Sequence, residues 1–268
     1  MIMLKSNRTE RKLPVAMDAL ASPFLNQLFG DALILQPGGG TKSTRVRKNK
    51  DVLVAGNHYE FVYANHDGWL FRYRILHNGR RQIIDFILPG QIFGLQACLF
   101  KRSLYSVATV TETSLSAIPF GMIDNMFEKN PKLSKALFWS AVCEGAILGE
   151  HLTDAARRSA YERVSHLLLE LFMRLHAVDR TEGMTFLMPL TQELIGDALG
   201  LTTVHVNRTF RSLRADKLIS IDSQCVTILD FEALSLLSDF ENSYLGESAR
   251  AIRERLNSSK QGGLSQGR

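Results

Sequence analysis

A short stretch of the chain combines basic, amide and imidazole side chains and contains no acid. Residues 202–215, TTVHVNRTFRSLRA, include His205, Asn207, Arg208 and Arg211 but neither aspartate nor glutamate. An arginine can donate two parallel hydrogen bonds to O6 and N7 of guanine, or it can bind a phosphate. Asparagine and histidine add further donors and acceptors. This chemistry suits the edges of bases in the major groove of DNA, provided that one helix presents all four side chains.

The apolar residues of this stretch recur at helical spacing, which predicts a helix with two different faces. Val206, Phe210 and Leu213 share one face. The opposite face carries Val204, Arg208, Arg211 and Ala215, with His205 and Ser212 beside them. A solvated helix face normally mixes acids with bases, and this one does not. An α-helix of this kind fits the major groove of B-DNA.

Two glycines four residues apart precede this helix, and each predicts a separate steric role. Thr191 can cap a helix that runs through Leu199, and Gly200 then stands where a left-handed residue ends a helix. Thr202 caps the next helix, so the linker is a three-residue turn, as in a helix-turn-helix. Gly196 would face the second helix at the crossing, where a side chain would hold the two apart. The small core is predicted from Ile195, Leu199, Leu201, Val206, Phe210 and Leu213.

This pattern points to a helix-turn-helix, and the alternative is an ordinary helical hairpin, which would not need the charge pattern. Residues 218–229 read as two short strands with a turn at 222–224, and they would form a wing beside the second helix. The candidate DNA-contacting residues are Thr191, Gln192, Thr202, Thr203, Val204, His205, Asn207, Arg208 and Arg211.

The N-terminal half has a different texture. From about residue 25 to 120, β-branched and aromatic segments alternate with turn signals such as HNGR at 77–80 and LPGQ at 88–91. This is the pattern of an antiparallel sandwich or barrel. The basic run 42–50 fits solvated strand ends, with a phosphate-binding patch as the alternative.

A proline-free segment after Pro131 predicts a long helix. Its apolar stripe recurs every three or four residues and comprises Leu137, Ala141, Gly145, Leu148 and Leu152. The small residues on it would let another helix approach closely. From the residues alone, that partner is either the chain's own β-domain or the same helix of a second copy. A second helix is expected in SAYERVSHLLLELFMRLHAV.

Composition limits the classes of protein that fit. The 268 residues carry a net charge of +5, and 45% of them are hydrophobic, which is ordinary for a globular protein. Cys98, Cys143 and Cys225 are far apart and odd in number, so we expect no disulfide framework and no clustered metal site. No apolar run approaches the roughly 20 residues of a membrane helix, and the first residues lack the apolar core of a signal peptide. We therefore expect a cytoplasmic protein without a membrane partner.

With these motifs in place, the chain resembles the Crp/Fnr family of bacterial transcription regulators over about residues 25 to 240. The resemblance rests on LHNGRRQIIDFILPGQIFG, the long helix after Pro131, ARRSAYERVSHLLLEL, and LTQELIGDALGLTTVHVNRTFRSLRADKLIS, in the order that the family has. It implies an α+β fold with an antiparallel β-roll like a cyclic-nucleotide-binding domain, a dimerising helix and a winged helix-turn-helix. The implied parts are a flexible tail at 1–24, a sensor β-roll at 25–125, a dimerisation helix at 126–157, a DNA-binding domain at 158–240 and a C-terminal tail at 241–268.

The chain departs from the family pattern at several positions that would bind ligands. Val204 stands where the recognition helix usually has a glutamate, while Arg208 keeps the arginine. The nucleotide-binding branch has a Gly-Glu pair and a later arginine, whereas here Gly94 is followed by Leu95, the arginine position is Ser106, and Arg102 comes about four residues too early. These four residues remain the candidate effector contacts.

The signatures of the family's cofactors are also missing from the sequence. Residues 86–111 contain no acid, so cyclic AMP in the familiar mode is not expected. An N-terminal cysteine cluster for iron-sulfur is absent from the sequence, and His77 reads as a surface residue rather than a haem ligand. We therefore expect none of these cofactors.

Three functions remain to be compared. The first is a homodimeric regulator that binds double-stranded DNA, works with RNA polymerase and senses an unknown small effector. The second is an enzyme with a DNA-binding-like appendage, but the glycines at 38–40 lack the Gly-Lys-Ser/Thr of a P-loop, and no nucleophile elbow or paired metal motif occurs. The third is an interaction module without a specific DNA target. We expect the first, a non-enzymatic regulator, and salt-dependent DNA binding separates it from the third.

Overall fold

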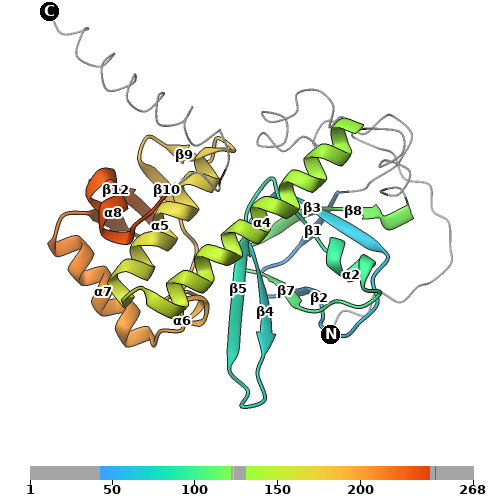
Figure 1. Ribbon diagram of the computed structural model, residues 1–268, viewed down its shortest axis with the longest axis horizontal. Coiled ribbons are helices and arrows are strands. Elements are labelled where there is room, and N and C mark those ends of the chain that lie inside the picture. Colours follow the sequence, from blue (N-terminus) through green and yellow to red (C-terminus); the bar gives the residue numbers. More distant parts are fainter. Residues whose placement is uncertain (1–42, 122, 124–130, 242–244, 246–268) are drawn as a thin grey trace, which may run out of the picture. The chain divides into compact units, whose positions relative to one another are not determined.

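The computed structural model describes residues 43–121, 123, 131–241 and 245. The chain divides into two compact units, Met1–Ala136 and Leu137–Arg268, and each is described by itself. The tail predicted at 1–24, most of the tail predicted at 241–268 and the glycines at 38–40 lie outside the described residues. The predicted α+β class is confirmed, with a β-sheet unit followed by a mainly helical one (Figure 1).

The first unit is built from two antiparallel sheets. Its described elements are β1 (Ser43–Val46), β2 (Asp51–Leu53), β3 (Phe61–Asp67), β4 (Leu70–Ile75), β5 (Arg81–Ile87), β6 (Ile92–Phe93), α2 (Leu95–Leu99), β7 (Ser106–Thr109) and β8 (Thr113–Pro119). The strands pair in the orders β1-β8-β3-β6 and β2-β7-β4-β5. The predicted antiparallel β-roll is therefore confirmed, whereas the short helix α2 was not predicted.

Side chains from both sheets form the core of the β-roll. The buried cluster comprises Leu53, Leu70, Ile87, Phe93, Val107 and Leu115. Tyr63 stacks on Phe93 with 5.3 Å between ring centroids. The predicted turns lie between strands: the Leu76 amide donates to the Arg80 carbonyl at 2.8 Å across the first, and Gly90 has a positive φ of 89° in the second. These turns need residues that tolerate a left-handed backbone, such as glycine, and such residues allow the turns to be predicted from the sequence.

The second unit begins with two consecutive helices and continues with a winged helix-turn-helix. Its elements are α4 (Pro131–Arg157), α5 (Ala160–His176), β9 (Thr181–Glu182), β10 (Thr185–Leu187), α6 (Gln192–Leu199), α7 (Thr203–Ala215), β11 (Ile219–Asp222), β12 (Cys225–Ile228) and α8 (Phe231–Ser238). The long helix after Pro131 and the helix that follows it are confirmed. From Leu137 onward α4 groups with the second unit, and the predicted domain boundaries at 125/126 and 157/158 stay predictions.

Helix α5 forms the centre of the second unit. A capping box starts it: Ser159 caps the first turn, and Glu162 bonds back to the Ser159 amide at 2.5 Å. Phe172 is completely buried, and its ring lies 6.0 Å from that of Phe186 on β10 and 6.3 Å from that of Phe231 on α8. One buried face of α5 therefore packs against both the wing sheet and α8.

A buried group of ionisable side chains joins α4 to α5. His166 is fully buried, with Nδ1 lying 3.1 Å from Asp154 Oδ2, and Arg158 donates to Asp154 at 2.9 Å. Glu170, also fully buried, accepts from Arg174 at 2.6 Å and bonds His151 Nε2 at 2.8 Å.

Burial by itself would raise the pKa of the Glu170 carboxyl. The neighbouring charges of His151, Arg174 and His166 outweigh that effect and bring the pKa down to about 2. Buried charges of this kind require partners. The network therefore joins α4 to α5 through paired buried side chains.

Candidate nucleic-acid interface

The two helices of the helix-turn-helix begin and end at the predicted residues. Thr191 Oγ1 accepts from the Leu194 amide at 3.2 Å and caps α6. Gly200 follows α6 with a left-handed φ of 68°. Thr202 Oγ1 accepts from the His205 amide at 3.2 Å and caps α7. The three-residue turn predicted from the glycine and the two caps is confirmed.

Gly196 lies where the chain folds back on itself. A β-carbon placed there would lie 2.5 Å from the carbonyl oxygen of Leu201, far inside van der Waals contact. The Leu201 amide in turn donates to the Gly196 carbonyl at 3.0 Å. The predicted close approach is confirmed, but the neighbour is the backbone of the turn rather than α7 itself.

The predicted core beneath the two helices is buried, with one exception. The buried members are Ile195, Leu199, Val206, Phe210 and Leu213. Leu201 was also predicted to belong to this core, but it is only half-buried. It sits in the turn, between the left-handed glycine and the cap of α7, so one side of its side chain stays open to solvent.

The outward face of α7 forms a hollow lined by predicted residues. Thr203, Val204, His205, Arg208 and Arg211 are exposed, and Thr191, Gln192 and Thr202 are exposed at the ends of the helices. A depression of about 430 Å³ is lined by Gln192, Thr203, Val204, Asn207, Arg208 and Arg211. Half-buried Asn207 donates from Nδ2 to Gln192 Oε1 at 3.2 Å and so links α7 to the first turn of α6.

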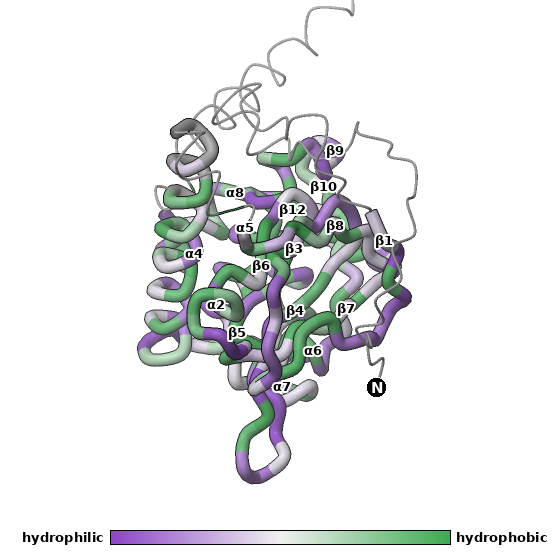
Figure 2. The backbone as a smooth tube through the Cα atoms, turned by 90° about the vertical axis from the view of Figure 1, so that its right-hand side faces the viewer, coloured by the Kyte–Doolittle hydropathy of each residue, from purple (hydrophilic) through white to green (hydrophobic). Residues whose placement is uncertain are grey.

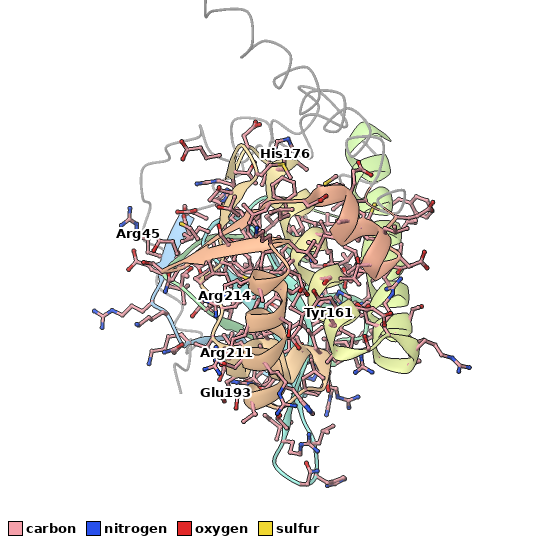
Figure 3. The ribbon with its side chains drawn as sticks, turned by 90° about the vertical axis from the view of Figure 1, so that its left-hand side faces the viewer. Arg45, Tyr161, His176, Glu193, Arg211 and Arg214 are labelled. Carbon is pink, nitrogen blue, oxygen red and sulfur yellow. The ribbon has the colours of Figure 1, made fainter. Side chains whose placement is uncertain are left out.

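The charge on this face has one sign. Helix α7 contains no acid, and Arg211 and Arg214 follow each other along it (Figure 3). Its N-terminal end carries the positive end of the helix dipole. The first turns of α5, α6 and α8 each carry a glutamate, whereas that of α7 carries none. A rigid, acid-free helix face with arginines and an amide on one side can bind a polyanion and hydrogen-bond base edges.

Two contacts from α5 support the helix-turn-helix from behind. Arg163 Nη1 donates to the Leu199 carbonyl at the end of α6, at 3.1 Å. Tyr161 Oη donates to the carboxylate of Asp216, which follows the last turn of α7. Burial and this bond to Asp216 raise the pKa of Tyr161 to about 12. The sequence reasoning missed both contacts, because nothing in helical spacing says which neighbouring element a polar side chain reaches.

The wing contains more strands than the sequence reasoning predicted. The hairpin of β11 and β12, with its turn at 222–224, is confirmed. The sheet continues through β10 to β9, in the order β11-β12-β10-β9. The segment TEGMTFL carries a hairpin signal in Gly183, which turns with a φ of 57°, but strands of two and three residues are too short to show alternation.

The exposed apolar face of α4 differs from the predicted stripe. Leu137 is buried within the chain and Leu148 is half-buried. Ala141, Gly145 and Leu152 are exposed as the stripe requires. The other exposed apolar or small side chains on this face are Phe138, Val142 and Gly149. Hydrophobic and hydrophilic residues alternate along the turns of α4 (Figure 2), and the face is rotated slightly from the prediction because Ile147 and Asp154 take the inner side.

The four candidate effector residues occupy the short segment around α2. Gly94 precedes α2 with a φ of 92°, and Leu95 begins the helix half-buried. Arg102 is exposed. Ser106 is buried, and its hydroxyl accepts from the Ala55 amide at 3.0 Å. The hydroxyl therefore already serves the β-roll's own backbone, and Arg102 points to solvent rather than into the core.

Several other ionisable side chains of the two units can be placed. His77 is exposed in the β4–β5 turn, as expected of a surface residue. Arg72, a cation on β4, is buried with its Nε 3.4 Å from Asp85. The three cysteines are free, and burial raises the pKa of the Cys98 and Cys143 thiols. Among the described residues, no three histidine, cysteine or carboxylate side chains gather as a metal site.

Comparison with known proteins identifies both units. Residues 162–237 match the model of the Crp-like helix-turn-helix domain, and residues 43–130 match that of the cyclic nucleotide-binding domain. The chain is 31% identical over 192 residues to the nitrogen fixation regulation protein FixK of Rhizobium meliloti, covering 71% of this chain and 84% of that protein. The chain belongs to the Crp/Fnr family.

A further relative supports this assignment, and a solved structure supports the fold. The transcriptional activatory protein AadR of Rhodopseudomonas palustris is 34% identical over 181 residues, covering 65% of this chain and 73% of that protein. The structure of FixK2 from Bradyrhizobium japonicum matches with a TM-score of 0.68 and 24% identity, covering 75% of this chain and 98% of that one. The chain is thus a transcription regulator of the Crp/Fnr type with a helix-turn-helix DNA-binding domain. None of the described helices is both long enough and apolar enough to cross a bilayer.

Proposed function

We propose that the protein binds a near-palindromic operator as a homodimer, with α7 of each copy in the major groove. The observation that carries this proposal is the hollow on α7, whose six lining residues come only from α6 and α7 and include no acid. Arg208 lies at the centre of this face and reads a base, and Arg211, one turn further, binds mainly a phosphate. Crp/Fnr proteins are transcription regulators, which supports a role with RNA polymerase in the cytoplasm rather than catalysis.

The exposed face of α4 supports dimerisation through this helix. Phe138 and Leu152 are each 71% exposed and Val142 is 49% exposed, which is costly for a helix that faces only water. Among the described residues, no neighbouring atom lies within 4 Å of a β-carbon built at Gly145 or Gly149, which leaves the backbone there open to close approach. Two copies that pair along this face would place two α7 helices on half-sites about 34–36 Å apart.

The β-roll is proposed to respond to a signal other than cyclic AMP bound in the familiar way. A buried phosphate needs a cation, and a ribose hydroxyl needs an acceptor such as a carboxylate. Leu95 is apolar, Ser106 already bonds Ala55, and the buried guanidinium of Arg72 lies against Asp85. Residues 86–111 contain no acid. We propose neither an iron-sulfur cluster nor haem as the signal that the β-roll senses. The proposed signal is a different small effector.

Selection of bound duplexes from a random pool, followed by dimethyl sulfate footprinting of guanine N7 in the major groove, tests this function. We expect two protected major-groove segments related by a dyad, about one helical turn apart. Sedimentation of the Leu152→Glu variant should show monomers, because a charge would be buried in the seam. The matched control Arg157→Glu, exposed about 140° round the same helix from Leu152, should stay dimeric. A single unpaired protected segment, or an unselective footprint, would contradict the proposal.

A further inference from the structure

Val204 places an apolar side chain in the middle of a polar, basic surface. Its side chain is 66% exposed, and it lines the hollow together with Gln192, Asn207 and Arg208. The apolar residues that hold α7 to its domain lie on the opposite face, and Val206 is fully buried there. Val204 therefore contributes nothing to the core of the domain.

Helix stability does not explain a valine at this position either. Val204 is the second residue of α7, where the helix dipole favours an acid. The equivalent first turns of α5, α6 and α8 contain Glu162, Glu193 and Glu232. A β-branched residue also has lower helix propensity than alanine or glutamate. Helix stability therefore does not account for this valine, and its position in the hollow suits contact with an apolar group of whatever the hollow binds.

The major groove of DNA presents one such group, the C5 methyl of thymine. The other features of its base edges are polar donors and acceptors. We propose that Val204 contacts a thymine methyl in each half-site and thereby makes the protein prefer thymine to cytosine at that position. This inference rests on the proposed entry of α7 into the major groove.

The geometry of the helix limits where the thymine lies. Val204 and Arg208 are four residues apart, so they are neighbours on one face and about 6 Å apart along the axis. Successive base pairs are separated by about 3.4 Å. The contacted thymine is therefore within about two base pairs of the guanine that Arg208 contacts.

Replacement of thymine by deoxyuridine removes only the methyl group and therefore tests the contact directly. The operator selected with the wild-type protein is synthesised with deoxyuridine at one thymine position at a time, in both half-sites. Loss of one buried methyl is expected to weaken binding about fourfold, or about fifteenfold for the two half-sites. We expect this loss at one position per half-site with the wild-type protein, and less than about twofold there with Val204→Ala.

Two further variants separate the contact from a general effect on folding. Val204→Ala should fold at least as well as the wild type, because alanine is the better helix former. Leu236→Ala is the matched control, since Leu236 is 86% exposed on α8 in the same domain and does not line the hollow. It should retain the full sensitivity to deoxyuridine.

The outcomes distinguish this inference from the function on which it rests. If the protein binds its operator tightly but every deoxyuridine substitution costs the wild type and Val204→Ala equally, the thymine contact is refuted and the DNA-binding function stands. If random duplexes bind as tightly as any selected one, the function itself fails, and the inference fails with it.

Discussion

Replacement of Gly196 by alanine should destabilise the DNA-binding unit, although alanine is the better helix former. A β-carbon at Gly196 would lie 2.5 Å from the Leu201 carbonyl oxygen, about 0.8 Å inside a normal carbon–oxygen contact. Overpacking of this kind costs about 1–3 kcal/mol. Strain on the 3.0 Å hydrogen bond from the Leu201 amide to the Gly196 carbonyl adds about 1 kcal/mol. The helix propensity of alanine returns about 1 kcal/mol. The net destabilisation is therefore about 1–3 kcal/mol, or several degrees in Tm.

Gly200→Ala is the matched comparison for this prediction. In the described part of the chain no neighbouring atom lies within 4 Å of a β-carbon at Gly200, so its cost of about 1–2 kcal/mol comes from the left-handed φ alone. Gly200→Asn should recover part of that cost, because asparagine tolerates this conformation. Thermal unfolding by circular dichroism gives the stabilities, and fluorescence anisotropy below the transition gives the affinity for the operator. Gly196→Ala should weaken DNA binding and Gly200→Asn should not. A Gly196→Ala protein that is more stable than the wild type would refute the reasoning.

Three other outcomes follow from the structure. Because the pKa of Glu170 is lowered to about 2, the stability that its charge provides is complete above its ordinary pKa and is lost as the pH falls toward 2. In an acid titration, protonation of Glu170 should lower the free energy of unfolding by about 3 kcal/mol. Glu170→Gln should remove most of this pH dependence and should lower stability at pH 7. Leu148 is only half-buried, so Leu148→Glu should weaken the dimer less than Leu152→Glu does, as sedimentation at several concentrations would reveal. Calorimetric titration with cyclic AMP should give no micromolar binding that tightens the operator complex, and such binding would overturn the proposal for the β-roll.

The helix-turn-helix was predictable because its constraints are local. Thr191 and Thr202 cap helices through hydrogen bonds three residues away, and Gly200 ends α6 through its own φ. Periodicity then separated the buried face of α7 from the exposed one. Such features are encoded within a few residues of sequence, so the lining of the hollow could be named before the fold was known.

Features that depend on distant neighbours could not be read from the sequence. The sequence around His166 reads as part of an amphipathic helix, and nothing in it says that Asp154 and Arg158 lie beside that ring. Periodicity placed Leu137 and Leu148 on the outer stripe of α4, whereas Leu137 is buried and Leu148 is half-buried, because neighbouring elements decide which side of a helix faces inward. Strands β9 and β10 are defined by pairing with β12 rather than by their own pattern.

The most direct test of the account compares Arg208→Ala with Arg211→Ala on the selected operator and on a scrambled duplex, across a series of salt concentrations. Arg208→Ala should lose about 1–3 kcal/mol on the operator and much less on the scrambled duplex, because a base contact carries sequence information. Arg211→Ala should weaken both duplexes alike and lower the slope of affinity against salt by about one. If Arg208→Ala loses the same affinity on both duplexes, then α7 does not read the operator through Arg208, and the central claim is wrong.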